Sequence, residues 1–349
     1  MIGIVLNIVM WVAFLLQLGH CSQAVVPDGR GLPLRVKLTN GLIERAFKIK
    51  PLFNLASANA RKTMIERGLT IGVDWRTNVD YLQSYIDRLE TNLEVIKKPS
   101  IVYPEYYQKS FHAYDLGNLC WKAAMEVDCA ALTVHAGIYT SGKDELSRDG
   151  DFMLRDKFHK NMLSIFSSIK FVPKRVLDIG CSTGLSTMKC LESFPEAEII
   201  GADFSPYMLS VAKFQQETVP EMDKAKKSIT YIHAAGENIP FGSGDIDLVT
   251  ISLVSHELPF SAAKAIFEEA YRILPLGGAF ALMDMDPKSI FFQKFASNPF
   301  AFTAFKSTEP WIQEYISMDL EKTLSTCGFV NIKVISNSPR HRTVVAFKV

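Results

Sequence analysis

The chain has 349 residues, of which 48% are hydrophobic and 21% are charged, a composition typical of a globular protein with one large or two modest domains. Its 38 basic and 37 acidic residues give a formal net charge of +1, so no field of one sign exists to attract nucleic acid. The six cysteines are scattered without the spacing of a metal site, so the sequence predicts neither a metal centre nor a disulfide framework.

The N-terminus is almost continuously apolar over residues 1–18. Ser22 and Ala24 follow it and resemble a small-residue cleavage site, which predicts a signal peptide over residues 1–24. No Lys or Arg precedes Arg30, so an uncleaved membrane anchor, a mis-assigned start and a buried helix stay open as alternatives. A signal peptide would direct the chain to the secretory pathway or endomembranes, or form half of an address to a complex plastid. An anchor would attach it to a membrane.

Residues 25–40 are rich in Pro and Gly and predict a linker. Residues 41–150 then have a helical pattern and predict a helical cap. One helix is expected over residues 59–67, and a second carries apolar residues at three- and four-residue steps from Leu82 to Ile96 before Pro99 ends it.

Aromatic residues crowd the cap between Tyr103 and Trp121. One interpretation is that these rings only pack the cap against the rest of the molecule. The other is a lid, in which polar aromatic tips and an imidazole face a bound substrate. For the lid, the candidate substrate residues are Tyr107, His112 and Tyr114.

Residues 151–349 begin with a helix and then alternate strands with helices. This alternation predicts an α/β fold with a doubly wound, mostly parallel sheet. Strands are expected at 175–179, 199–203, 229–234, 246–253 and 279–284, and a closing hairpin at 329–336 and 343–348. Ser205 is expected to cap the helix after the second strand, with Pro206 at its first position.

The stretch from residue 174 to 189 has the pattern of a strand, a glycine turn and a helix start. Gly180 and Gly184 let the backbone bend tightly and approach a ligand, and the first N–H groups of a helix favour a polar or anionic group. Asp203 ends the second strand, where a carboxylate can accept both hydroxyls of a ribose. Together these residues predict a site for a cofactor that contains a nucleoside.

The sequences VLDIGCSTG and GADFSPYML, which begin at Val176 and Gly201, resemble motifs I and II of class I S-adenosylmethionine-dependent methyltransferases. The resemblance covers about residues 150–349 and is closest to the type 11 branch that includes ubiquinone/menaquinone C-methyltransferases. It implies a Rossmann-like seven-stranded sheet and S-adenosyl-L-methionine as cofactor. The cap resembles the helical extension of uncharacterised plant and algal members, which brings no assigned activity.

The resemblance also implies roles for single residues. Asp178 and the turn of Gly180, Ser182 and Gly184 would hold the amino-acid end of the cofactor, with Ser182 at the family's middle glycine. Asp203 would hold the ribose, and Phe204 would lie against the adenine. In the third loop, Ala235 replaces the aspartate that normally meets the adenine amino group, so adenine would depend on Phe204, Gly236 and Glu237.

Two residues after the later strands are candidates for chemistry. His256 follows the fourth strand and could take a proton from the acceptor, or it could be a structural loop residue. Asp284 follows the fifth strand and could orient the substrate or cap the next turn.

We therefore expect a methyltransferase that acts on O or C of a small, apolar or aromatic acceptor, with no metal and no nucleic-acid partner. A different class stays open: a catalytically silent cofactor-binding protein whose cap is an interaction surface. An NAD-type dehydrogenase is disfavoured by the spacing of Asp178, Gly180 and Gly184. The sequence does not indicate an oligomeric state.

Overall fold

The computed structural model describes residues 61–110, 114–140, 145–218, 229–298, 302, 305–306 and 308–349. The predicted leader (1–24), the predicted linker (25–40) and the candidate substrate residue His112 lie outside this range. Within the described part, no helix combines the length and the apolar character needed to cross a membrane.

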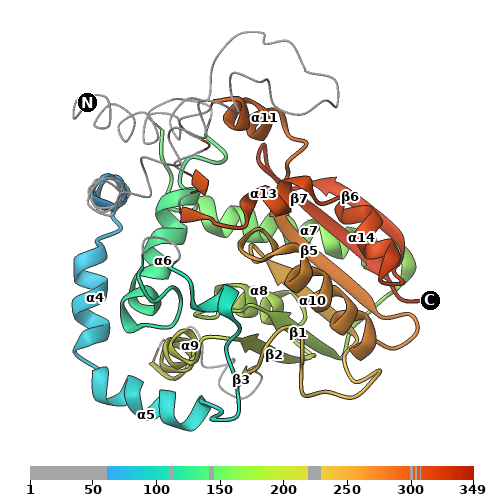
Figure 1. Ribbon diagram of the computed structural model, residues 1–349, viewed down its shortest axis with the longest axis horizontal. Helices are drawn as coiled ribbons and strands as arrows, with labels where there is room; N and C mark the ends of the chain where they lie inside the picture. Colours follow the sequence, from blue (N-terminus) through green and yellow to red (C-terminus); the bar gives the residue numbers. More distant parts are fainter. Residues whose placement is uncertain are drawn as a thin grey trace.

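A seven-stranded sheet forms the centre of the molecule, with strand order β3-β2-β1-β4-β5-β7-β6 (Figure 1). β1 to β5 pair in parallel, whereas β7 pairs antiparallel with both β5 and β6. The strands are β1 (Arg175–Ile179), β2 (Glu198–Asp203), β3 (Ile229–His233), β4 (Leu248–Ser252), β5 (Ala279–Met285), β6 (Val330–Ser336) and β7 (His341–Phe347). The order changes direction between β1 and β4, and in such sheets ligands bind beyond the carboxyl ends of the strands.

Helices cover both faces of the sheet, and for that reason its strands are apolar on both sides. The helices and short 3-10 turns are α4 (Trp75–Gln83), α5 (Ile86–Ile96), η1 (Glu105–Gln108), α6 (Trp121–His135), α7 (Gly150–Ile169), α8 (Leu185–Ser193), α9 (Pro206–Thr218), η4 (Ser255–Glu257), α10 (Phe260–Ile273), α11 (Ile290–Ser297), α13 (Ile312–Ser317) and α14 (Leu320–Thr326). A further helical stretch occupies residues 61–70.

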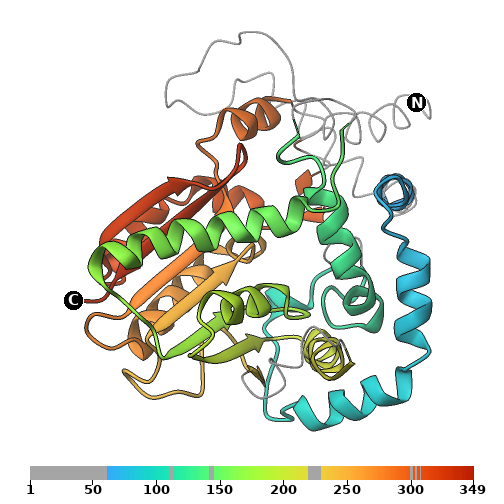
Figure 2. The same cartoon turned by 180° about the vertical axis from the view of Figure 1, so that it is seen from behind.

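Successive residues of β1 show how the two faces are used. Val176 belongs to the buried cluster that includes apolar residues of α7 and α8, while Leu177 belongs to the one that includes residues of α10, α13 and α14. Figure 2 shows α7 lying across one face of the sheet, and Figure 1 shows α10 and α14 on the other. The alternating βα pattern therefore predicted the layers correctly.

The cap differs from its prediction at one point. The spacing from Leu82 to Ile96 predicts one continuous helix, but α4 ends at Gln83 and α5 begins at Ile86. The backbone turns at Tyr85, whose ring packs 5.0 Å from that of Phe214 on α9. α5 and α6 then bury Leu89 and Met125 in one cluster with the apolar residues of α9.

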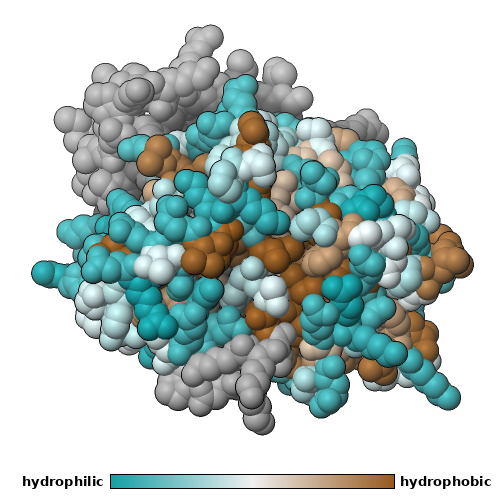
Figure 3. Space-filling view, turned by 90° about the horizontal axis from the view of Figure 1, so that it is seen from below, coloured by the Kyte–Doolittle hydropathy of each residue, from teal (hydrophilic) through white to brown (hydrophobic). Residues whose placement is uncertain are grey.

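The surface between these elements is mixed. In the view from below in Figure 3, hydrophobic side chains gather near the middle of the face, within a largely hydrophilic surround.

Candidate functional site

The turn after β1 is shaped by two glycines with positive φ. Gly180 has a φ of 73°, and a Cβ there would come within 2.5 Å of the Val254 side chain. Gly184 has a φ of 95°, and a Cβ there would meet the hydroxyl of Tyr231. Side chains at either position would strain the backbone and fill this space, so the turn depends on glycine.

Asp178, at the end of β1, is fully buried beneath this turn. Its carboxylate accepts hydrogen bonds from the hydroxyls of Ser186 (2.6 Å), Thr187 (2.8 Å) and Thr250 (3.0 Å). Burial raises the pKa of this carboxyl, and the three hydroxyls oppose that rise. Asp178 thus ties the first turn of α8 to β1 and β4. Its contact with the amino-acid end of a cofactor stays a prediction.

Asp203 joins the ends of β1 and β2. Its carboxylate accepts from the backbone N–H groups of Ser182 (2.8 Å) and Ser205 (2.7 Å). Burial raises the pKa of Asp203, and these two N–H donors offset part of the rise, which leaves the pKa at about 6. The carboxylate therefore retains its negative charge at neutral pH and holds the glycine turn against the start of α9. As predicted, α9 begins at Pro206, and the Ser205 hydroxyl accepts from the N–H of Met208.

The aromatic segment of the cap packs on Phe204. The rings of Tyr103 and Tyr107 lie 5.0 Å and 4.7 Å from that of Phe204. His233 supports the same contact: its Nδ1 accepts from the Lys98 N–H at 2.9 Å, and its Nε2 lies 3.1 Å from the Phe204 carbonyl oxygen. The cap thus lies directly on the loop predicted to contact adenine.

The loop after β3 also contacts the cap. The hydroxyl of Tyr106 donates to the carboxylate of Glu237. Gly236 is packed so closely that a Cβ would lie 3.0 Å from side-chain atoms of Ile179 and Ile266. The cap therefore reaches both loops that the sequence assigns to adenine, at Phe204 after β2 and at Glu237 after β3.

His256, in the turn after β4, forms a pair with Asp284, near the C-terminal end of β5. Nδ1 of His256 lies 2.7 Å from Oδ1 of Asp284, whose Oδ2 accepts from the His256 backbone N–H at 3.2 Å. Burial lowers the pKa of His256, but the charge of Asp284 and this hydrogen bond outweigh it and raise the pKa to about 10. The imidazole is thus protonated at neutral pH, which makes it a hydrogen-bond donor and not a ready proton acceptor.

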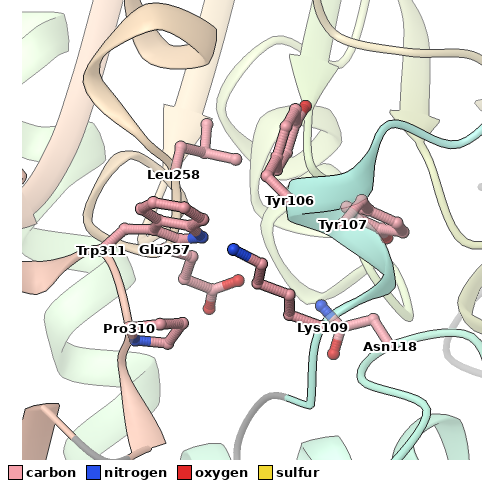
Figure 4. Close-up of a pocket in the computed structure, with 8 residues that line it drawn as sticks. All are labelled: Tyr106, Tyr107, Lys109, Asn118, Glu257, Leu258, Pro310 and Trp311. Carbon is pink, nitrogen blue, oxygen red and sulfur yellow. The ribbon is translucent and has the colours of Figure 1, made fainter.

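A pocket opens between the cap and the loops after β4 and before α13 (Figure 4). Its lining residues come from several segments far apart in the sequence: Tyr106, Tyr107, Lys109, Asn118, Glu257, Leu258, Pro310 and Trp311. In Figure 4 the Lys109 ammonium points toward the Trp311 ring, and its nitrogen lies 4.7 Å from the ring centroid. Sequence analysis missed Lys109 and Trp311 because no local pattern links residues two hundred positions apart.

The structure distributes the predicted substrate residues unevenly. Tyr107 lines this pocket and also packs on Phe204, so it lies between the pocket and the residue predicted to contact adenine. Tyr114 instead donates from its hydroxyl to Glu126 at 2.8 Å, and its ring packs in the cluster shared by the cap and α9. The role of Tyr114 at an acceptor has no support from this arrangement.

A buried polar network beside the glycine turn was also missed. Thr183 donates to Asp128 on α6, which also accepts from the Gln215 side chain at 2.8 Å. Nearby, Asp151 on α7 pairs with Arg155 at 2.8 Å and with Nδ1 of His135 at 2.6 Å. The four-residue spacing of Asp151 and Arg155 was a detectable signal, whereas the contact from α6 to the turn was not.

The residues at this edge fit a nucleoside cofactor. The two glycines allow a tight turn that any other residue would strain, and the Ser182 hydroxyl in the same turn is buried with no protein partner among the residues that the structure describes. An ordered water, an ion or a ligand group could each supply the hydrogen bond that this hydroxyl lacks. In contrast, the described residues include no group of three or more His, Cys, Asp or Glu side chains that could hold a metal ion.

Comparison with known proteins agrees with this geometry. Residues 176–278 match a family model described as a methyltransferase domain. The chain is 31% identical over 162 residues to an uncharacterized methyltransferase of Synechocystis sp., covering 46% of this chain and 68% of that protein. It is 30% identical over 120 residues to a demethylmenaquinone methyltransferase of Thermus thermophilus, covering 34% of this chain and 51% of that protein.

The chain therefore spans about two thirds of the first relative and about half of the second. Among solved structures, it is similar to a SAM-dependent methyltransferase from Aquifex aeolicus, with 17% identity and a TM-score of 0.42 over 56% of this chain and 93% of that one.

Proposed function

This chain belongs to the class I S-adenosylmethionine-dependent methyltransferases, and we propose that it moves the methyl group to an oxygen or carbon of a small, apolar or aromatic acceptor. The observation that supports the proposal is the position of Tyr106 and Tyr107 in the aromatic cap. These residues contact Phe204 and Glu237 in the predicted cofactor loops, and they also line the pocket. An aromatic wall of this kind suits an acceptor that is apolar or flat.

S-adenosylmethionine supplies a methyl group on a sulfonium, which is already activated for displacement. The glycine turn would receive its amino-acid end, Asp203 its ribose hydroxyls, and Phe204 its adenine face, with Gly236 and Glu237 beside it. Because Asp203 has a pKa of about 6, it accepts these hydroxyls as a carboxylate at neutral pH. What remains for the protein is to hold the acceptor in line with the methyl group and away from water.

His256 would act on the acceptor as a proton-carrying hydrogen-bond donor. Its pair with Asp284 maintains the imidazolium at neutral pH, so it can stabilise negative charge on an acceptor oxygen. This differs from both interpretations that the sequence left open, a general base and a structural loop residue. A phenol, enol or quinol that releases its proton to solvent water would be held as its anion, which donates an electron pair either from oxygen or from carbon.

A direct assay tests the proposal. The full chain would be incubated with isotopically labelled S-adenosylmethionine and separate panels of phenols, quinols and aliphatic amines, and S-adenosylhomocysteine formation would be measured. We expect turnover with members of the first two panels and none with Asp203→Ala. Turnover confined to amines would refute oxygen or carbon transfer. Cofactor binding without turnover on any panel would favour a silent cofactor-binding protein.

We further propose that the N-terminal apolar segment directs the protein to the secretory pathway or to a membrane, and that its partner is a small molecule and not nucleic acid. The near-neutral charge supports the second part. Fusion of residues 1–24 to a fluorescent reporter would test the first part. Diffuse cytosolic fluorescence would refute it.

A further inference from the structure

The pocket between the cap and Trp311 has a chemically uneven lining. Three aromatic side chains, Tyr106, Tyr107 and Trp311, come from its opposite sides, and Leu258 and Pro310 add apolar surface. The lining also contains the cation Lys109 and the carboxylate of Glu257. We propose that this pocket is the acceptor site and that it takes a flat aromatic ring carrying both a carboxylate and a hydroxyl group.

The ring is assigned to the aromatic walls. In Figure 4, the Trp311 indole faces across the pocket toward the turn that carries Tyr106 and Tyr107. Trp311 is only partly buried, so its ring has surface available for another partner. Flat rings gain both apolar burial and offset or edge contacts in such a setting, which a flexible aliphatic chain does not.

The carboxylate is assigned to Lys109. The Lys109 side chain is 45% exposed, and its ion pair with Glu105 spans 3.9 Å to a side chain that is 93% exposed. Its ammonium also lies 4.7 Å from the centroid of the Trp311 ring. Both are weak interactions in water, whereas a charge-assisted hydrogen bond to a ligand carboxylate inside the pocket is stronger.

The hydroxyl is assigned to the loop after β4. Glu257 lines the pocket, so its carboxylate is placed to accept a hydrogen bond from a ligand hydroxyl. That hydrogen bond would fix the orientation of the hydroxyl.

Tyr107 links this pocket to the cofactor loops. One side of the η1 turn lines the pocket, while Tyr107 packs on Phe204 and Tyr106 donates to Glu237. Any ligand that fixes Phe204 and Glu237 also fixes a wall of the pocket. We therefore expect the bound cofactor product to strengthen acceptor binding, and the acceptor to strengthen cofactor binding by the same factor.

The test rests on the proposed function and uses calorimetry with the full chain saturated by S-adenosylhomocysteine. The probes are 4-hydroxybenzoate, benzoate, 4-methylphenol and 4-hydroxycyclohexanecarboxylate. We expect 4-hydroxybenzoate to bind at least tenfold more tightly than the cyclohexane analogue and at least threefold more tightly than benzoate or 4-methylphenol. Omitting S-adenosylhomocysteine should weaken its binding.

Substitutions locate the binding. Lys109→Met should weaken 4-hydroxybenzoate at least tenfold but change 4-methylphenol less than twofold. The matched control is Lys122→Met, because the Lys122 ammonium also lies over a tyrosine ring, at 5.8 Å from the Tyr114 centroid, but does not line the pocket. Trp311→Leu should weaken both probes. If that variant unfolds, a shift of the Trp311 indole N–H resonance by 4-hydroxybenzoate in the wild-type chain replaces it.

Equal binding of the aromatic and cyclohexane acids would overturn the proposal, as would equal effects of the two lysine substitutions. If the pocket proposal failed in this way but the protein still methylated other oxygen or carbon acceptors, the proposed function would stand. Absence of S-adenosylhomocysteine binding by the folded chain would instead contradict the proposed function itself, so the two failures are distinguishable.

Discussion

Ser182 combines two unfavourable features in the glycine turn. Its φ is 50°, in the left-handed region, and its buried hydroxyl has no protein partner in the part of the chain that the structure describes. The first costs about 1–2 kcal/mol and the second about 1–3 kcal/mol. A residue with both costs is retained more readily if its hydroxyl contacts a ligand.

Ser182→Gly should therefore separate stability from cofactor affinity. We expect the free energy of unfolding to rise by about 1 kcal/mol, since glycine tolerates this φ and removes the orphaned hydroxyl. Affinity for S-adenosylhomocysteine should fall by up to about tenfold, as one hydrogen bond is lost. Urea denaturation and calorimetry measure the two effects. Ser182→Ala is the control, because it removes the hydroxyl but retains the strain. A less stable glycine variant would contradict this explanation.

Asp203→Ala should affect both the ligand and the turn. Loss of an ionised acceptor for two ribose hydroxyls should weaken S-adenosylhomocysteine binding by about 2–4 kcal/mol. Stability should fall as well, because the N–H groups of Ser182 and Ser205 lose their acceptor. In the wild-type chain, affinity should decline as pH falls through about 6, where Asp203 becomes protonated. Calorimetry at pH 5 and pH 7.5 checks this, and an affinity that does not change with pH or substitution would contradict the ribose role.

The His256–Asp284 pair predicts a specific dependence of stability on pH. The folded-state pKa of His256, about 10, lies above the ordinary value of 6.5. Because the pKa is raised on folding, the contribution of the His256–Asp284 pair to the free energy of unfolding is fully present below about pH 6.5 and is lost as pH rises through 10.

His256→Gln should thus be more damaging at pH 6 than at pH 9.5. The loss of unfolding free energy caused by the substitution should be larger at pH 6 than at pH 9.5 by at least about 1.4 kcal/mol, the equivalent of one pKa unit. Urea denaturation of both proteins at the two pH values measures this, with the titration of other groups cancelling between them. Equal damage at both values would show that the pair does not carry the assigned charge.

At the scale of elements, the segment from Lys97 to Ser110 joins the cap to the sheet. The Lys98 N–H donates to His233, and the Tyr106 hydroxyl donates to Glu237. The rings of Tyr103 and Tyr107 pack on Phe204. These contacts lie at the cofactor loops, so a ligand that orders those loops should also order the segment.

Hydrogen exchange tests this coupling. Amide protection over residues 97–110 should rise when S-adenosylhomocysteine binds, and rise further with 4-hydroxybenzoate. α14, which packs against β6 at the edge of the sheet opposite β3, is the internal control and should not respond. If protection of the segment is already maximal without ligands, and Tyr107→Phe lowers only stability, the segment is core packing and not a lid.

The elements also show what local sequence can predict. Strand, glycine turn and acidic strand end are local patterns, so β1, β2 and the turn at Gly180 were predicted close to their observed bounds. The break at Tyr85 was not, because apolar spacing continues across it and the cause is packing on Phe214. Lys109 and Trp311 meet only in the folded chain, and nothing near either residue indicates the other.

At the scale of the whole molecule, the cap and the sheet domain share a core. The sequence divides the chain into a cap over residues 41–150 and a methyltransferase domain over 151–349. The described structure buries Leu89 of α5 and Met125 of α6 with Met208, Val211 and Phe214 of α9. Ser210 on α9 also donates to the Leu89 carbonyl oxygen at 2.5 Å. Removal of the cap would therefore expose an apolar face of α9 and leave a hydroxyl without its acceptor.

The fragment 151–349 should consequently be less stable than a chain that lacks only the leader. Burial of each large side chain contributes about 1.5–3 kcal/mol, so exposing several at once approaches the total stability of a typical domain. We expect the fragment to melt at least about 10 °C lower and to bind a dye specific for exposed apolar surface, whereas the chain shortened by residues 1–24 should melt like the full protein. Replacing Met208 and Phe214 with Gln in the fragment should reduce dye binding, because those side chains carry the exposed face. A fragment that melts with the full chain, binds no dye and retains its affinity for S-adenosylhomocysteine would show that the cap is an accessory lid on an independent domain.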